Sequence, residues 1–287
     1  MTRPGLALSV LVLAAFTGPA SAGITFGPVR AQPGESVRLV THAETTGGTI
    51  ELTRDGKSRK GTMTLIRDRE LTWTFRDPAA DGTRRGMVRV SKLATFSKSV
   101  VAGKEEKSSD SSPLTGKMFA MSKPPQGDWT FELDGSVPYT RVSDEIKELT
   151  VYLQRDWYPA RELNLGDSWE FDPAWVKMII EKDLVKAKTI GTMRLRQIRR
   201  GEKRQVAIID VTIRGTGADF QADGSESGAS IELTGQVIVN LDTMLDESLE
   251  LKGTLTSNSG KAGESTKLKL PISLLVTKSF VIAAPMP

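Results

Sequence analysis

The sequence predicts an α+β protein in which long antiparallel strands, arranged as a sandwich or half-barrel, pack on one or two central helices. Three observations favour this class. Most of the chain alternates apolar and polar residues with a period of two, which is typical of strands with one buried and one solvated face. Helix signals are confined to the middle of the chain. Cysteine is absent, so neither disulfides nor thiolate metal sites can stabilise the fold.

The first 22 residues have the features of a secretory signal peptide. Arg3 supplies a positive charge, residues 6–16 form an apolar run, and residues 20–22 are the small residues that signal peptidase accepts. The apolar run is shorter than the roughly 20 residues of a membrane-spanning helix. We therefore expect cleavage between Ala22 and Gly23, and a periplasmic or extracellular protein without a transmembrane anchor.

An N-terminal antiparallel β region is predicted over residues 23–128. Short alternating runs, such as Leu71-x-Trp73-x-Phe75, lie between turn signals such as Asp55-Gly56. Residues 103–113 contain no apolar side chain except that of Pro113, so we expect a solvated loop there.

The same region is basic. Residues 23–125 carry 18 Lys and Arg against 11 Asp and Glu. This excess is either the charged outer face of several strands, where Lys and Arg oppose edge-to-edge aggregation, or a surface for an anionic lipid or polysaccharide. Nucleic acid is not expected as a partner of an exported protein.

A central helical segment is predicted over residues 129–188. Ser143 is suited to cap a helix, and Ile146, Leu149, Leu153 and Trp157 follow at helical spacing. Pro159 would end this helix. A second, shorter helix is predicted to start at Asp172-Pro173.

Aromatic residues are concentrated in this segment: nine of the 17 in the chain lie between Trp129 and Trp175. They either line a ligand site or fill the space between curved sheets as a hydrophobic plug. The candidate ligand-binding residues are Tyr152, Trp157, Trp169, Phe171 and Trp175.

The stretch Leu163-Asn164-Leu165-Gly166-Asp167-Ser168-Trp169-Glu170-Phe171 lies within this segment. It resembles a V/L-x-x-G-D-[ST]-W element that begins a strand in uncharacterised secreted bacterial β-rich proteins. The resemblance covers about nine residues and the helix before them. It implies a turn at Gly166-Asp167 and a strand after it, and it assigns no activity to any residue.

A C-terminal antiparallel meander of five strands is predicted over residues 189–287, where period-two alternation is clearest. Turn signals such as Asn258-Ser259-Gly260 separate its strands. Pro271 cannot donate to a ladder, so its strand should lie at an edge or carry a bulge. The two β regions are either separate or parts of one continuous domain from residue 23.

Catalytic and metal-binding patterns are weak. The only histidine, His42, falls on the polar side of its strand, and no nucleophile elbow or phosphate loop occurs. No cofactor and no transition metal are expected. Asp219, Gln221 and Asp223 resemble the beginning of a calcium loop, but no carboxylate stands at its twelfth position.

The function predicted first is therefore that of a non-enzymatic binding or carrier module for a hydrophobic, lipid-like ligand. The alternative is a structural or interaction protein of the cell envelope with a packed core, whose partner would be an envelope component. A hydrolase is the third hypothesis, with the least support. An apolar cavity beside Trp157 and Trp169 would distinguish the first hypothesis from the second.

Overall fold

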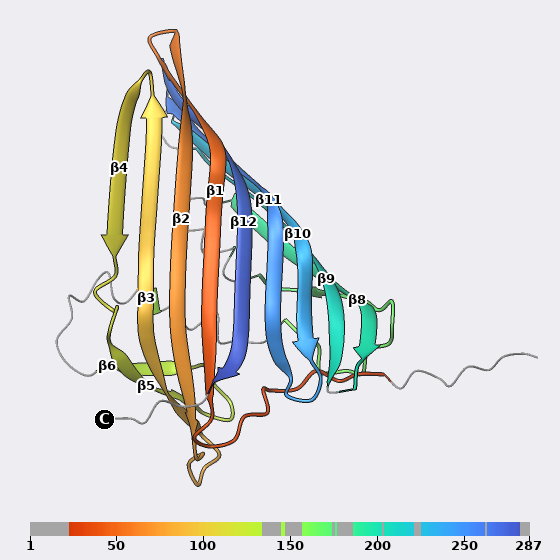
Figure 1. Cartoon of the computed structure of the whole chain (residues 1–287). Helices are drawn as coiled ribbons and strands as arrows, with labels where there is room; N and C mark the ends of the chain where they lie inside the picture. The colour runs from red at the N-terminus through yellow and green to blue at the C-terminus, as the bar shows by residue number, and fades with distance from the viewer. Residues whose placement is uncertain are drawn as a thin grey trace, which may run out of the picture.

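Twelve antiparallel strands form a single sheet in the described part of this chain, whose structure is a computed structural model (Figure 1). The structure describes residues 23–133, 145–146, 157–173, 176, 186–202, 204–220, 225–261 and 263–281. The strands are β1 (Ser36–Arg54), β2 (Lys57–Arg76), β3 (Arg84–Val101), β4 (Lys104–Ser111), β5 (Met118–Lys123), β6 (Thr130–Leu133), β7 (Ser168–Phe171), β8 (Lys186–Arg200), β9 (Gln205–Phe220), β10 (Glu226–Asn240), β11 (Leu245–Lys261) and β12 (Glu264–Val281).

The strand order is β6-β5-β3-β2-β1-β12-β11-β10-β9-β8-β7, and β4 pairs with β3 beside β5. Strands β8 to β12 are consecutive neighbours in the sheet and form an antiparallel meander. The first and last strands pair at the middle of the sheet, from Ser36 opposite Val281 to Arg54 opposite Glu264. Strands from the two predicted β regions therefore belong to one continuous sheet.

Pro271 lies in the central strand β12, where it is opposite Thr254 of β11. On its other side, the pairing with β1 shifts register between Glu44 and Thr49, opposite the stretch that contains Pro271. The missing N–H of proline thus coincides with an extra residue in the neighbouring strand β1, so the edge alternative is wrong and the bulge lies in β1 rather than in the strand of Pro271.

Two glycines allow β10 and β11 to approach closely. A Cβ atom at Gly235 would lie 1.8 Å from the carbonyl oxygen of Glu250, and one at Gly253 would lie 1.8 Å from that of Glu232. Only glycine fits such backbone contacts, and glycine within a strand often marks a bend of this kind. These positions permit the strong curvature of the sheet seen in Figure 1.

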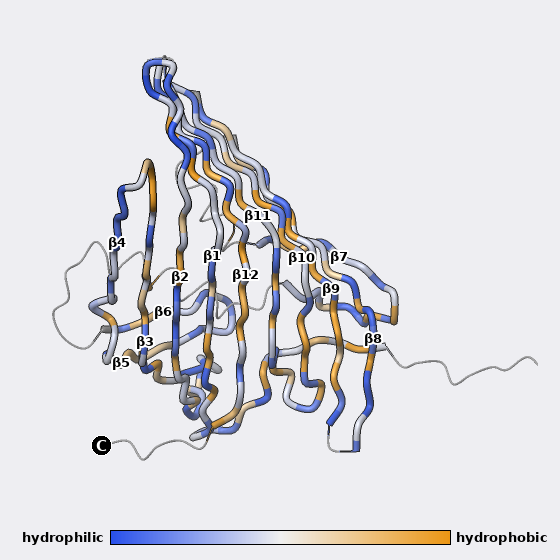
Figure 2. The backbone as a smooth tube through the Cα atoms, turned by 45° about the horizontal axis from the view of Figure 1, so that its top comes forward, coloured by the Kyte–Doolittle hydropathy of each residue, from blue (hydrophilic) through white to orange (hydrophobic). Residues whose placement is uncertain are grey.

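The hydrophobic core lies on the inner face of the curved sheet. Over part of each long strand, buried residues alternate with more exposed ones. Figure 2 shows that hydrophobic and hydrophilic residues alternate along these strands. Fully buried examples are Val37 on β1, Val88 on β3, Ile209 and Ile213 on β9, and Leu251 on β11.

The predicted α+β class is wrong, because the described residues form one antiparallel sheet and no helix. Glu145, Ile146 and Val176 are the described residues with helical backbone. Of the other residues of the predicted helices, Trp157 lies at a turn and Asp172-Pro173 has no regular structure. The rest lie outside the described residues. Within the described residues, the inner face is covered by the curvature of the sheet and by two segments without regular structure. These are residues 23–33, which run along the lower end of the sheet in Figure 1, and residues 157–166.

The prediction of a loop at residues 103–113 is also wrong over most of that range, because β4 occupies Lys104–Ser111 and pairs with β3. Every residue of β4 is exposed. A strand with two solvated faces has no apolar alternation, so periodicity could not identify it.

Candidate functional site

A cavity of about 700 Å³ lies at the lower end of the sheet in Figure 1. The N-terminal segment from Phe26 to Pro33 forms one wall. The facing wall comes from the ends of β2 and β3, from β5 and from Trp129. Tyr158, Leu245 and Lys278 complete the lining. Residues from the two ends of the chain meet here because β1 and β12 are neighbours.

Five aromatic rings form much of the cavity wall: Phe26, Trp73, Phe75, Trp129 and Tyr158. Phe26 stacks on Tyr158, with ring centroids 4.6 Å apart and planes 21° apart. Trp73 is buried, and its indole Nε1 has no hydrogen-bond partner among the described residues. Such a wall suits an apolar ligand, since aromatic side chains offer large rigid surfaces.

A buried polar group forms the inner boundary of the cavity. The hydroxyl of Tyr158 donates to Asp246 Oδ1 at 2.9 Å, and Lys278 Nζ lies 3.5 Å from Asp246 Oδ2. The side chains of Lys278 and Asp246 are only 8% and 4% exposed. Charges so deeply buried need partners, and here each charge has the other.

A bulge in β11 turns Asp246 toward the core. Val239 pairs with Asp246 but the preceding Ile238 pairs with Ser248, so Glu247 is an extra residue in the ladder. The extra residue changes the side on which Asp246 would otherwise point. Glu247 itself is held outside by Arg204, at 2.6 Å, and by the Asn240 amide, at 2.9 Å.

Among the described residues that line the cavity, the charged ones are all cations: Arg76, Arg84, Arg85, Lys123 and Lys278. This described lining includes no Asp, Glu, His, Ser or Thr. The described wall therefore combines apolar surface with positive charge.

The structure places three of the five predicted ligand-binding residues together in the core. Trp169 and Phe171 are each 8% exposed, and the Trp169 indole donates to the carbonyl of Trp157 at 2.7 Å. Trp157 meets Phe171 edge to face, with centroids 6.4 Å apart. Tyr152 and Trp175 lie outside the described residues.

The space beside Trp157 is small. Trp157, Leu39, Val237 and Asp246 line a void of about 20 Å³, which has room for about one water molecule. The large cavity begins one residue further along the chain, at Tyr158, and Tyr158 packs against both Trp157 and Trp169.

Sequence reasoning missed Phe26, Trp129, Tyr158 and Lys278 as cavity residues. One readable signal was present for Lys278, which continues the apolar phase of Leu270, Leu274 and Val276 along β12. Trp129 and Tyr158 belong to the aromatic-rich segment but were not among the candidate residues, and no local pattern connects Phe26 with that segment.

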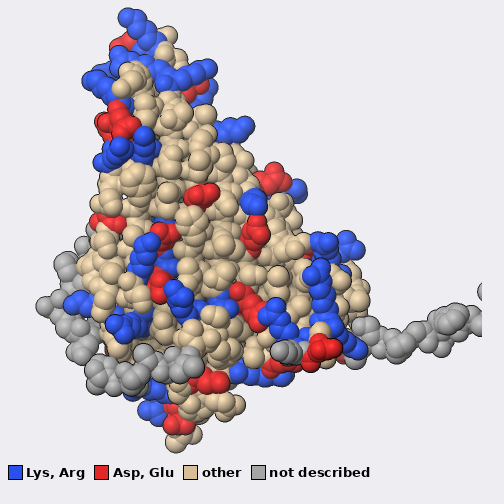
Figure 3. All heavy atoms as spheres, viewed as in Figure 1, with Lys and Arg blue, Asp and Glu red and all other residues tan. Residues whose placement is uncertain are grey.

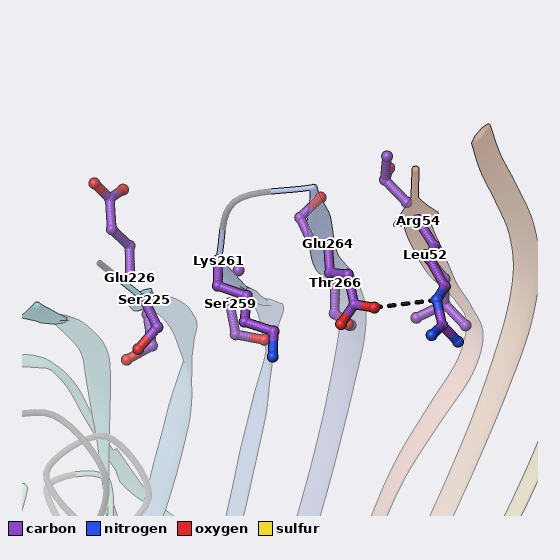
Figure 4. A pocket seen from close by; sticks show the side chains of 12 residues that line it. Leu52, Arg54, Ser225, Glu226, Ser259, Lys261, Glu264 and Thr266 are labelled. Atoms are coloured by element: carbon purple, nitrogen blue, oxygen red, sulfur yellow. Dashed lines mark ion pairs between the residues drawn. The ribbon is translucent and has the colours of Figure 1, made fainter. Parts of the chain in front are cut away.

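A second, polar cavity of about 450 Å³ lies at the opposite end of the sheet, between the ends of β1, β10, β11 and β12 (Figure 4). Arg54 and Glu264 form an ion pair across β1 and β12 at 3.1 Å. Glu226 points away from this pair. Both members of the pair are exposed, so solvent weakens the field that they could apply to a ligand.

His42 belongs to a charged network on the outer face of the sheet, where Figure 3 shows cations beside carboxylates. Its Nδ1 lies 2.7 Å from Asp68 Oδ1, and Lys92 Nζ lies 2.6 Å from Asp68 Oδ2. The hydrogen bond to Asp68 raises the pKa of His42, and hydrogen bonds from Lys92 and then His42 lower the pKa of Asp68. The other ring nitrogen faces Glu44 at 3.5 Å, so carboxylates flank the imidazole where a triad would need a nucleophile.

Asp219 lies near the end of β9, and Gln221 and Asp223 lie outside the described residues, so the calcium-like loop stays a prediction. Where residues are described, no three acidic or histidine side chains come together as a metal site requires. No helix in the described ranges has the length and apolar composition needed to cross a bilayer.

Comparison with known proteins identifies no family for this chain. No family model matches the chain, and no curated protein matches it. Among solved structures, OccK7 (OpdD) of Pseudomonas aeruginosa has a TM-score of 0.28 at 7% identity, over 86% of this chain and 100% of that one. An outer membrane channel of Pseudomonas putida F1 has a TM-score of 0.24 at 9% identity, over 88% and 98%. A β-barrel-like protein of a domain of unknown function from Brucella abortus has a TM-score of 0.18 at 11% identity, over 88% and 100%.

Proposed function

We propose that the protein is an exported, non-enzymatic binding or carrier module that holds a hydrophobic, lipid-like ligand in the lower cavity. The observation that carries this proposal is the cavity itself. Its volume of about 700 Å³ falls within the roughly 300–1,000 Å³ of small-molecule sites. Five aromatic rings and several proline and aliphatic side chains line it, so a ligand would gain free energy mainly by burying apolar surface.

The chemistry of the lining favours binding over catalysis. The titratable groups at the inner boundary, Tyr158, Asp246 and Lys278, already bond to one another. The described lining has no hydroxyl or thiol nucleophile besides the Tyr158 phenol, which donates to Asp246. The signal-peptide features of residues 1–22 support export.

Titration of the purified protein with the neutral fluorescent probe N-phenyl-1-naphthylamine tests the proposal. We expect saturable enhancement of probe emission. The variant Ala31→Trp places an indole in the lining and should abolish the enhancement, because the new ring takes the space of the ligand. Ala80→Trp is the control, since Ala80 is exposed and lies outside the lining.

Native mass spectrometry of the exported protein gives an independent measurement, and a co-purifying amphiphile is the expected result. If the probe does not bind and no small molecule co-purifies, the carrier proposal fails. A structural or interaction protein of the envelope would then be the better explanation.

A further inference from the structure

We propose that the ligand is an amphiphile with an anionic head group, a carboxylate or a phosphate, and that cations at the mouth of the lower cavity bind this group. The four cations are Arg76, Arg84, Arg85 and Lys123, here called the basic rim. This inference rests on the proposed function and names the class of ligand that the cavity would select.

The sheet register brings the basic rim together. Arg76 at the end of β2 is directly opposite Arg85 of β3, and Arg84 of β3 is directly opposite Lys123 of β5. Directly opposed residues have Cβ atoms about 4.5–5.5 Å apart, and like charges in such pairs destabilise a sheet. Two adjoining pairs of like charges therefore cost stability, which an anionic ligand would relieve.

Several cations elsewhere on this sheet form ion pairs. Arg38 pairs with Glu70 at 3.0 Å, and Lys98 pairs with Glu105 at 2.8 Å. Within the described ranges, no member of the basic rim has a carboxylate within ion-pairing distance. The nearby Asp81 carboxylate accepts a hydrogen bond from the Thr83 backbone N–H at 2.9 Å, and its pKa is lowered chiefly by that bond, with a smaller contribution from Arg85.

The position and the chemistry of the basic rim are those expected of a head-group site. Arg76, Arg84 and Arg85 are exposed, whereas the aromatic wall behind them is partly or fully buried. An acyl chain can thus lie against Trp73, Phe75 and Trp129 while its head group stays at the surface. Arginine suits both carboxylate and phosphate because its planar guanidinium donates two parallel hydrogen bonds to either.

The test compares ligands that share one acyl chain and differ in head group. The probes are palmitate, palmitoyl lysophosphatidylglycerol, zwitterionic palmitoyl lysophosphatidylcholine and neutral monopalmitoylglycerol, each titrated below its micelle concentration and followed by tryptophan emission. We expect at least one anionic ligand to bind tenfold or more tightly than the neutral one, and salt to weaken only that binding. Comparison of palmitate with the lysophosphatidylglycerol distinguishes a carboxylate site from a phosphate site.

The double variant Arg84→Gln with Arg85→Gln should remove the preference for the anionic head group and leave binding of the neutral ligand unchanged. Arg89→Gln on the same strand is the matched control, because Arg89 is exposed and does not line the cavity. Equal affinity for anionic and neutral ligands, or a preference that survives the double variant, would overturn the inference and leave the proposed function standing. Absence of binding by all four ligands would overturn both.

Discussion

Breaking the buried ion pair between Asp246 and Lys278 should destabilise the protein far more than breaking an exposed one. Replacing Lys278 by Met leaves the Asp246 carboxylate buried beside the Tyr158 hydroxyl but without the Lys278 ammonium group. Removing one partner of a buried pair costs about 3–5 kcal/mol. For a domain of this size, each kcal/mol shifts the melting temperature by about 2–4 °C, so the expected fall is about 6–20 °C.

The double variant Asp246→Leu with Lys278→Met provides the decisive comparison. It removes both charges and leaves apolar side chains in an apolar environment, so most of the lost stability should return. Urea unfolding followed by tryptophan emission measures the change, as a shift in midpoint at constant slope.

Lys252→Met is the control, because Lys252 and Glu250 are 2.6 Å apart but exposed. The distance in this pair is shorter than the 3.5 Å of the buried pair, yet solvent screening should leave the unfolding midpoint unchanged. The reasoning is refuted if Lys278→Met is as mild as Lys252→Met, or if the double variant is no more stable than the single variants.

Three further predictions concern the sheet, the aromatic cluster and the histidine. Gly235→Ala should prevent stable folding or lower the melting temperature strongly, because its Cβ would lie 1.8 Å from a backbone oxygen. Gly34→Asn, at a turn with open space, should be tolerated. Circular dichroism measures the melting temperature of both variants. Trp157→Ala should cost about 3 kcal/mol in urea unfolding through the void that it leaves, and Trp157→Phe should cost clearly less; equal losses would contradict a packing role. His42 is the only histidine, so its NMR titration can be assigned directly: its pKa should exceed 6.5 and fall toward that value in Asp68→Asn. Because the folded-state pKa is raised, the His42 contribution to stability is complete below pH 6.5 and disappears as pH rises through the folded-state pKa.

Local patterns predicted β elements in most of the long strands, which bury one face, but not in the short β5, although Phe119 and Met121 are buried there. Strands β8 to β12 alternate apolar and polar residues over part of their length, and short connections favour consecutive antiparallel pairing. The turn predicted at Asn258-Ser259-Gly260 is wrong, because these residues pair on both sides within β11. β4 was missed because both of its faces are solvated. The predicted helices gave the wrong class because the described sheet covers its apolar face by curvature and by irregular segments, which have no periodic signal.

The lower cavity could be predicted only in part from the sequence. The alternation of Trp73 and Phe75 and the basic character of the first third were visible in the sequence. Their meeting with Phe26, Tyr158 and Lys278 was not, because it depends on the pairing of the first and last strands.

By itself, then, the sequence determined the composition of the protein, its signal-peptide features and the faces of its regular strands, since these depend on residue type and on neighbours within a few positions. The tertiary structure alone decided the order of strands, the partners of the buried charges and the position of the cavity. The Asp246 side chain shows the physical reason: one extra residue in β11 reverses the face to which it points, and Lys278, its partner, lies 32 positions away on the neighbouring strand. Contacts of this kind arise from register and closure of the whole sheet, which no local pattern encodes.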